Sequence, residues 1–301
     1  MPAARQSLLP AALAALTNAT VWGLSWIPLK WLEAHGVGTL WTTLLIFAAC
    51  ALAVLAARPA SLRRALASPQ LAWVVLASGL TNGCFNLALA SGDVVRSVLL
   101  FYLMPMWVVL LARWLLHEAI TAAAIGRIVV ALAGAMLVLG EGRWSVPTPT
   151  SAADWLAVVA GFSFGCNNVL LRKFASLPDD ARSLAMFSGA VICAPIGMLA
   201  LALLGHSPGQ PPHGVAAWLV IALFALAVLV GNLALQYGAT RLRANVLSVL
   251  MLAEILVASL SSWWAGTALL SATTLAGGLL IVAASLLAIF TRAPRDQAAP
   301  G

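Results

Sequence analysis

The feature that most constrains this chain is a series of ten nearly charge-free apolar runs, each about 20 residues long. A helix of that length spans the hydrocarbon core of a bilayer, because each residue adds 1.5 Å of rise. Only 8% of the residues are charged, against roughly 25% in a soluble globular domain. Such a chain cannot cover a water-facing surface, so we expect an all-α integral membrane protein.

The runs predict ten transmembrane helices with short connections. Turn-forming residues mark the breaks, among them Pro178-Asp179 and the three prolines between His206 and Gly214. The helices are expected near residues 8–32, 37–57, 71–91, 94–115, 120–140, 154–174, 183–205, 216–238, 244–264 and 268–290.

The basic residues predict the orientation of these helices. Ten spans place both termini on one side, and of the sixteen Lys and Arg residues only Lys30, Arg96 and Arg143 fall on the other. Because cytoplasmic loops carry an excess of Lys and Arg, both termini are expected in the cytoplasm. The net charge of +7 is explained by these loops, and no basic patch with interleaved aromatics suggests nucleic acid as a partner.

The two halves of the chain resemble each other. The run Asn86 to Leu89, followed by Gly92, recurs 146 residues later as Asn232 to Leu235, followed by Gly238. Two further runs recur at similar offsets: Trp22 to Ser25 as Phe164 to Asn167, and Ser97 to Pro105 as Val246 to Glu254.

This pattern predicts two repeats, residues 1–146 and residues 147–301, each with five spans. Because five is odd, the second repeat enters the membrane upside down. Inverted repeats of this kind are a recurring plan of transporters and place the substrate site near the middle of the membrane.

Three short motifs add a family resemblance. They are the start Trp22-Gly23-Leu24-Ser25, the run Leu103 to Trp107, and His117-Glu118 with Gly126 nine residues after the histidine. In this order they resemble the drug/metabolite transporter (DMT) superfamily, in its ten-helix EamA-type branch. The run Ser248 to Glu254 is similar to amino-acid exporters of the YddG type within that branch.

The resemblance implies both a fold and an activity. Helices 1, 3, 4, 6, 8 and 9 would surround a central cavity. The implied function is a secondary transporter that exports amino acids, aromatic or other neutral ones, and related metabolites across the bacterial inner membrane by alternating access. One departure is that no acidic residue in the second half matches Glu118.

Other functions remain open at this point. A drug or other metabolite efflux carrier of the same fold and a passive channel are the alternatives. No catalytic or dinucleotide motif and no metal-ligand pair stands in the sequence, so we expect no enzyme, no cofactor and no metal. The expected partners are a small solute and the lipid bilayer, and the chain is expected to be a monomer. A single acid within the membrane permits proton antiport without requiring it.

Glu254 is the strongest candidate for a functional residue. It lies about eleven residues into the helix near 244–264, close to the bilayer centre, where a charge costs roughly 2.5–3.5 kcal/mol. It could bind a substrate ammonium group or a proton, or it could be a structural carboxyl that is hydrogen-bonded between helices.

Polar residues also share helical faces at spacings of three and four, on four different helices. Such faces should look inward, toward a cavity or toward another helix. The candidate substrate-binding residues are Trp22, Ser25, Asn82, Asn86, Tyr102, Trp107, Ser163, Asn167, Asn232, Gln236 and Glu254.

Two backbone features complete the prediction. Pro105 is expected to kink the fourth helix and could serve in gating, since proline removes a helical hydrogen bond. Gly161 and Gly165 have a GxxxG spacing, which favours close packing of the helix near 154–174 within the bundle over dimerisation.

Overall fold

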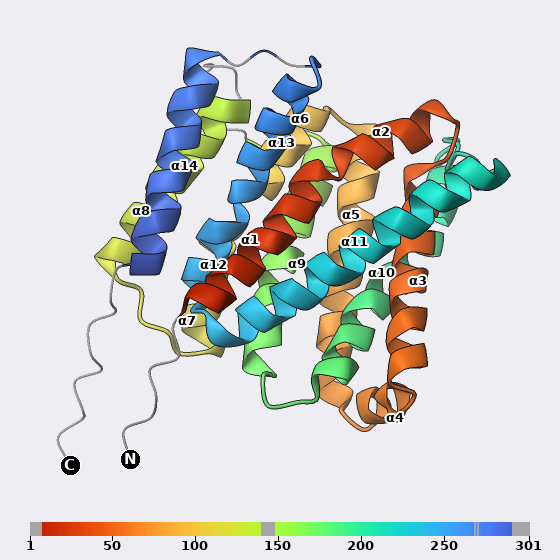
Figure 1. Ribbon diagram of the computed structural model, residues 1–301, viewed down its shortest axis with the longest axis horizontal. Helices are drawn as coiled ribbons and strands as arrows, with labels where there is room; N and C mark the ends of the chain where they lie inside the picture. Colours follow the sequence, from red (N-terminus) through yellow and green to blue (C-terminus); the bar gives the residue numbers. More distant parts are fainter. Residues whose placement is uncertain (1–7, 140–147, 268, 270, 291–301) are drawn as a thin grey trace.

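The computed structural model describes residues 8–139, 148–267, 269 and 271–290. These residues form fourteen α-helices and one short 3-10 helix, arranged as a bundle (Figure 1). In chain order the elements are α1 (Leu9–Leu24), α2 (Trp26–Ala34), α3 (Thr39–Ala57), α4 (Ala60–Leu66), η1 (Pro69–Leu71), α5 (Ala72–Ser91), α6 (Val94–Phe101), α7 (Met104–Leu115), α8 (Ala122–Leu139), α9 (Ala152–Lys173), α10 (Asp179–Leu203), α11 (Gly214–Arg241), α12 (Ala244–Met251), α13 (Ala253–Trp264) and α14 (Ala272–Phe290).

Ten stretches within the described residues are long and apolar enough to cross a membrane, which confirms the predicted span count. Six are single helices, one joins η1 to α5, and three consist of two α-helices in line: α1 with α2, α6 with α7, and α12 with α13. The beginning of α1 and the end of α14 lie at the same end of the bundle (Figure 1). Below, this end is called the α10 start, because α10 also begins there.

Two of the interrupted spans contain a proline three or four residues after the break. Pro28 lacks the N–H that would donate to the carbonyl of Leu24, the last residue of α1. Pro105 likewise lacks the N–H that would donate to the carbonyl of Phe101, where α6 ends. The fourth span is thus interrupted just before Pro105, where a kink was predicted, and the first span, predicted near 8–32, is present as α1 followed by α2.

The third break, at Leu252 between α12 and α13, was not expected. No proline stands near it, and Leu252 itself keeps helical backbone angles. The break lies 149 residues after the one at Leu103, as the repeat offset of Ser97 to Pro105 requires. The interruption therefore follows the repeat and not a local helix-breaking residue.

The helix α10 begins earlier than predicted. It starts at Asp179, four residues before the expected start at 183. Asp179 and Asp180 occupy the first turn, where negative charge interacts favourably with the helix dipole. Arg182, expected in a connecting loop, is consequently inside the helix and buried.

Helix contacts pair the two halves symmetrically. The contact of α5 with α9 has its counterpart in α1 with α11, and that of α7 with α9 in α1 with α13. The α8–α14 and α3–α10 contacts each join equivalent spans of the two halves. Exchanging the halves maps these contacts onto one another, as expected for two inverted five-helix repeats. The predicted boundary between 146 and 147 lies outside the described residues.

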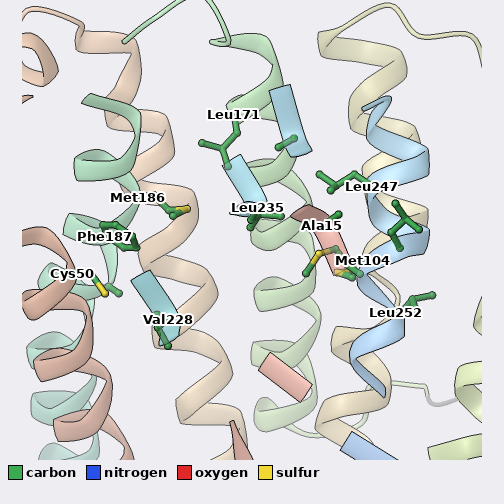
Figure 2. Close-up of a cluster of buried hydrophobic side chains, with 14 of the residues drawn as sticks. Ala15, Cys50, Met104, Leu171, Met186, Phe187, Val228, Leu235, Leu247 and Leu252 are labelled. Carbon is green, nitrogen blue, oxygen red and sulfur yellow. The ribbon is translucent and has the colours of Figure 1, made fainter. Parts of the chain in front are cut away.

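The packed core crosses the boundary between the halves. One cluster of buried apolar side chains includes Cys50 of α3, Met104 of α7, Phe187 of α10 and Leu252 (Figure 2). In lipid the hydrophobic effect between helices is weak, so close packing supplies much of the association energy. The shared core therefore holds the halves together around the cavity described next.

Candidate functional site

A central cavity of about 190 Å³ lies where helices of both halves meet. Spans 1, 3, 4, 6, 8 and 9, which the family resemblance implied, all contribute to its wall, and α3 and α10 add one residue each. The lining residues are Trp22, Phe47, Ser78, Thr81, Asn82, Phe85, Val98, Phe101, Tyr102, Phe164, Asn167, Met186, Asn232, Leu235 and Glu254.

Six of the candidate residues from the sequence line this cavity. They come from six different spans, which the fold brings to one level of the bundle. They are Trp22, Asn82, Tyr102, Asn167, Asn232 and Glu254.

The other candidates lie outside the cavity wall. Asn86 donates to the Thr43 hydroxyl at 3.1 Å, and the Ser25 hydroxyl donates to the backbone carbonyl of Trp22 at 2.6 Å. Trp107 packs edge-on against Phe162.

Ser163 is buried outside the cavity wall, and Gln236 donates to the Ser183 hydroxyl at 2.9 Å. Pro105 is buried in the first turn of α7. A shared helical face was the reason for pairing Asn82 with Asn86 and Asn232 with Gln236. Only one member of each pair, Asn82 and Asn232, lines the cavity, while the other is hydrogen-bonded to a neighbouring helix.

The centre of the site is a hydrogen bond between the halves. The Tyr102 hydroxyl donates to the Glu254 carboxylate, Oη to Oε1, at 2.8 Å. Tyr102 follows the last residue of α6, and Glu254 lies in the first turn of α13, so each stands at a helix break. The hydrogen bond from Tyr102 offsets part of the cost of a charge in the membrane.

The amide side chains around the cavity present oxygen atoms. Asn82 and Asn232 use their NH₂ groups to donate to the carbonyls of Ser78 and Val228, one turn earlier on their own helices. Their side-chain oxygens therefore remain as acceptors. The side-chain oxygen of Asn167 is buried and has no hydrogen-bond partner among the described residues.

Aromatic rings form much of the remaining wall, and several of them were missed from the sequence. Phe101 packs against Phe85 and Phe164, with ring centroids 4.7 and 5.6 Å apart, and Trp22 stacks on Phe47 at 6.5 Å. One signal could have identified Phe164, because it occupies the position equivalent to Trp22 in the internal repeat. Phe47, Phe85 and Phe101 are mid-span aromatics with no repeat or spacing to distinguish them from core residues.

The charge of the cavity is one-sided. Among its lining residues Glu254 is the only ionisable acid, and no Lys, Arg or His is present. Acceptor oxygens, one carboxylate and aromatic faces suit a cationic group such as an ammonium. In the described part of the chain no three His, Cys, Asp or Glu side chains cluster as metal ligands would.

Two ion pairs, one near each end of α9, connect the sixth span with the start of the fourth span and with the loop that follows it. Arg96 Nε lies 2.9 Å from Asp154 Oδ2 at the start of α9, where Asp154 also caps the helix. Arg172 Nε lies 2.9 Å from Glu118 Oε1 near the end of α9. Glu118 therefore contributes to the contact between the halves rather than to the cavity.

Comparison with known proteins agrees with this architecture. One solved crystal structure shares the fold with a TM-score of 0.74 and 22% sequence identity, over 92% of this chain and 96% of that one. No curated protein matches the chain. Residues 9–140, which contain the first five spans, match the EamA-like transporter family.

Proposed function

We propose that this chain is a secondary transporter that exports small amine-bearing solutes, amino acids among them, across the bacterial inner membrane by alternating access. The observation that carries the proposal is the Glu254 carboxylate, which faces the cavity and is hydrogen-bonded to Tyr102 at 2.8 Å. A substrate ammonium would bind the carboxylate and the amide oxygens of Asn82, Asn167 and Asn232.

The size and the aromatic wall of the cavity support a small apolar or aromatic side chain on the solute. A volume of about 190 Å³ is below the roughly 300–1,000 Å³ of pockets that hold drug-sized ligands. Amino acids and related metabolites fit this size better than drugs do. Phe85, Phe101 and Phe164 would pack against the apolar part of the solute.

The position of the site between the two repeats supports a carrier. Inverted repeats that exchange conformations open a central site first to one side and then to the other. The direction of export and the choice of the bacterial inner membrane come from the family resemblance, and the orientation of the chain comes from the positive-inside rule. All three are part of the proposal.

The test is uptake into proteoliposomes with a matched set of solutes. The set contains an amino acid, the amine left by its decarboxylation and the acid left by its deamination, each with and without a pH gradient. Wild-type protein should carry the two amine-bearing solutes and show saturable counterflow, which a passive channel does not.

Glu254→Gln should lower kcat/KM for both amine-bearing solutes at least tenfold, since a charge-assisted hydrogen bond contributes about 1.5–3 kcal/mol. Glu33→Gln is the matched control, because Glu33 is an exposed carboxylate on α2 outside the cavity. Equal transport by wild type and Glu254→Gln would refute the role of the carboxylate.

A further inference from the structure

A buried polar layer lies one helical turn beyond the cavity, toward the α10 start. Three cavity-lining residues each have a neighbour four residues away, about 6 Å along the helix. Since α9 and α11 end where α10 begins, all three neighbours lie on the same side of the cavity. The pairs are Asn167 with Leu171, Met186 with Arg182, and Asn232 with Gln236.

Hydrogen bonds connect these neighbours into one layer, here called the Arg182 layer. Arg182 Nη1 donates to the backbone carbonyl of Leu171 at 3.3 Å. Gln236 donates through Nε2 to the hydroxyl of Ser183, the residue after Arg182. Leu171, Arg182, Ser183 and Gln236 therefore join α9, α10 and α11 directly beside the cavity.

The charge of Arg182 is deeply buried, yet its ion-pair partner among the described residues is an exposed acid. Its side chain is only 2% exposed, and its ion-pair partner Asp179, on the same helix, is 86% exposed. A buried guanidinium is costly unless it is paired and fully hydrogen-bonded. The exposed Asp179 remains largely hydrated, so it compensates the buried charge poorly.

The layer also contains hydrogen-bonding groups that are not used. Arg182 Nε and Gln236 Oε1 are buried and have no partner among the described residues, and the same holds for the side-chain oxygen of the nearby Asn167. Each unsatisfied buried group costs free energy, so such groups are retained where something else binds them. An unused guanidinium N–H is a donor suited to a carboxylate.

We propose that the Arg182 layer is a second subsite of the solute path, which binds the carboxylate of an amino acid as it moves between the cavity and the α10 start. The proposal rests on the proposed function, because it assumes that the solute carries an amine that Glu254 binds. The cavity itself offers no cationic side chain to a carboxylate. Arg182, one turn from Met186 along α10, supplies that missing charge.

The Arg182–Leu171 hydrogen bond also has a structural role. It satisfies a carbonyl in the last turn of α9, where a cation interacts favourably with the helix dipole. A purely structural role and a subsite differ in what they do to selectivity. Loss of structure lowers transport of every solute, whereas loss of the subsite lowers only transport of solutes with a carboxylate.

The test compares an amino acid with its decarboxylated amine, for example phenylalanine with 2-phenylethylamine, in proteoliposomes of the full chain. Arg182→Gln should lower kcat/KM for the amino acid at least tenfold relative to the amine. Arg182→Lys keeps the charge but loses the Nε donor, and Gln236→Leu removes only the amide, so both should shift the same ratio less. Arg64→Gln is the control, since Arg64 is half-exposed and pairs with Asp180 at the same end of the bundle.

Direct binding supplies a measurement that does not depend on transport. In detergent, 3-phenylpropanoate, which has the carboxylate but no amine, should raise the unfolding temperature of wild type and of Arg64→Gln, but not of Arg182→Gln. An unchanged ratio of amino acid to amine in all three layer variants, with transport preserved, would overturn the subsite. If wild type carries neither solute, the proposed function itself fails, and the subsite fails with it.

Discussion

Replacing Gly161 with alanine should destabilise the protein, although alanine is the better helix former. Gly161 lies in α9 against the break between α6 and α7. A Cβ added there would lie 2.5 Å from the carbonyl oxygen of Phe101, and real Cβ contacts are essentially never shorter than 3.0 Å. The two helices must therefore separate by at least about 0.5 Å, a shift of the size that overpacking produces.

The size of the effect follows from two opposing contributions. Overpacking of a close contact costs about 1–3 kcal/mol, and the change from glycine to alanine inside a helix gains about 0.5–1 kcal/mol. Gly126 is the matched control, because it lies inside α8 and an added Cβ would meet nothing within 4 Å. Gly161→Ala should therefore be about 1–3 kcal/mol less stable than Gly126→Ala.

Unfolding in detergent measures this difference, with both variants and wild type compared in the same micelles. Transport provides a second readout, because Phe101 lines the cavity and a displaced carbonyl changes the wall. If Gly161→Ala is as stable as Gly126→Ala and transports normally, the close approach of α9 to the break in the fourth span is wrong.

Three further predictions can be checked separately. Tyr102→Phe removes the hydrogen bond to Glu254. In a double-mutant cycle with Glu254→Gln, measured on amine transport, the coupling free energy should be at least about 1 kcal/mol. Additive effects of the two substitutions would contradict a direct bond. Arg64→Gln breaks an ion pair whose arginine is half-exposed, so the free energy of unfolding should fall by less than about 1 kcal/mol, and by still less in high salt. Reporter tags on the two ends of the chain should be found in the same compartment, the cytoplasm, and tags on opposite faces would be incompatible with ten spans.

The spans could be predicted from the sequence because the bilayer imposes a simple condition on each of them. A helix such as α3 must be apolar for about 20 residues, whatever it packs against. Equivalent positions such as Asn86 and Asn232 could also be identified, because the repeat offset is found by comparing the sequence with itself. These two observations sufficed for the fold class and for the order of the helices.

Which residues line the cavity depends on how the helices pack together, and the sequence of a single helix does not contain that information. Asn82 and Asn86 share a face, and only the level at which the other helices cross decides that Asn82 lines the cavity while Asn86 binds Thr43. The Tyr102–Glu254 bond joins residues 152 positions apart at two helix breaks, one of which has no proline. Arg182 appeared to be a loop residue because α10 begins four residues earlier than its hydropathy indicated.

The repeat duplicates the scaffold without duplicating its chemistry. Pro105 occupies the position equivalent to Glu254, and Ala90 the position equivalent to Gln236, at offsets of 149 and 146. The carboxylate therefore comes from the second half alone, and the α1–α8 half has no amide to match that of Gln236 in the Arg182 layer.

This asymmetry gives the proposed path a direction. If the α10 start faces the cytoplasm, as the positive-inside rule predicts, an exported amino acid meets the Arg182 layer before the cavity. Its carboxylate would then be bound at the entrance, one helical turn before its amine reaches Glu254. On the opposite side the position equivalent to Gln236 is Ala90, and the amide of Asn86, one turn beyond Asn82, donates to Thr43. A solute that leaves toward that face therefore gives up its contact with Glu254 without meeting a counterpart of the Arg182 layer.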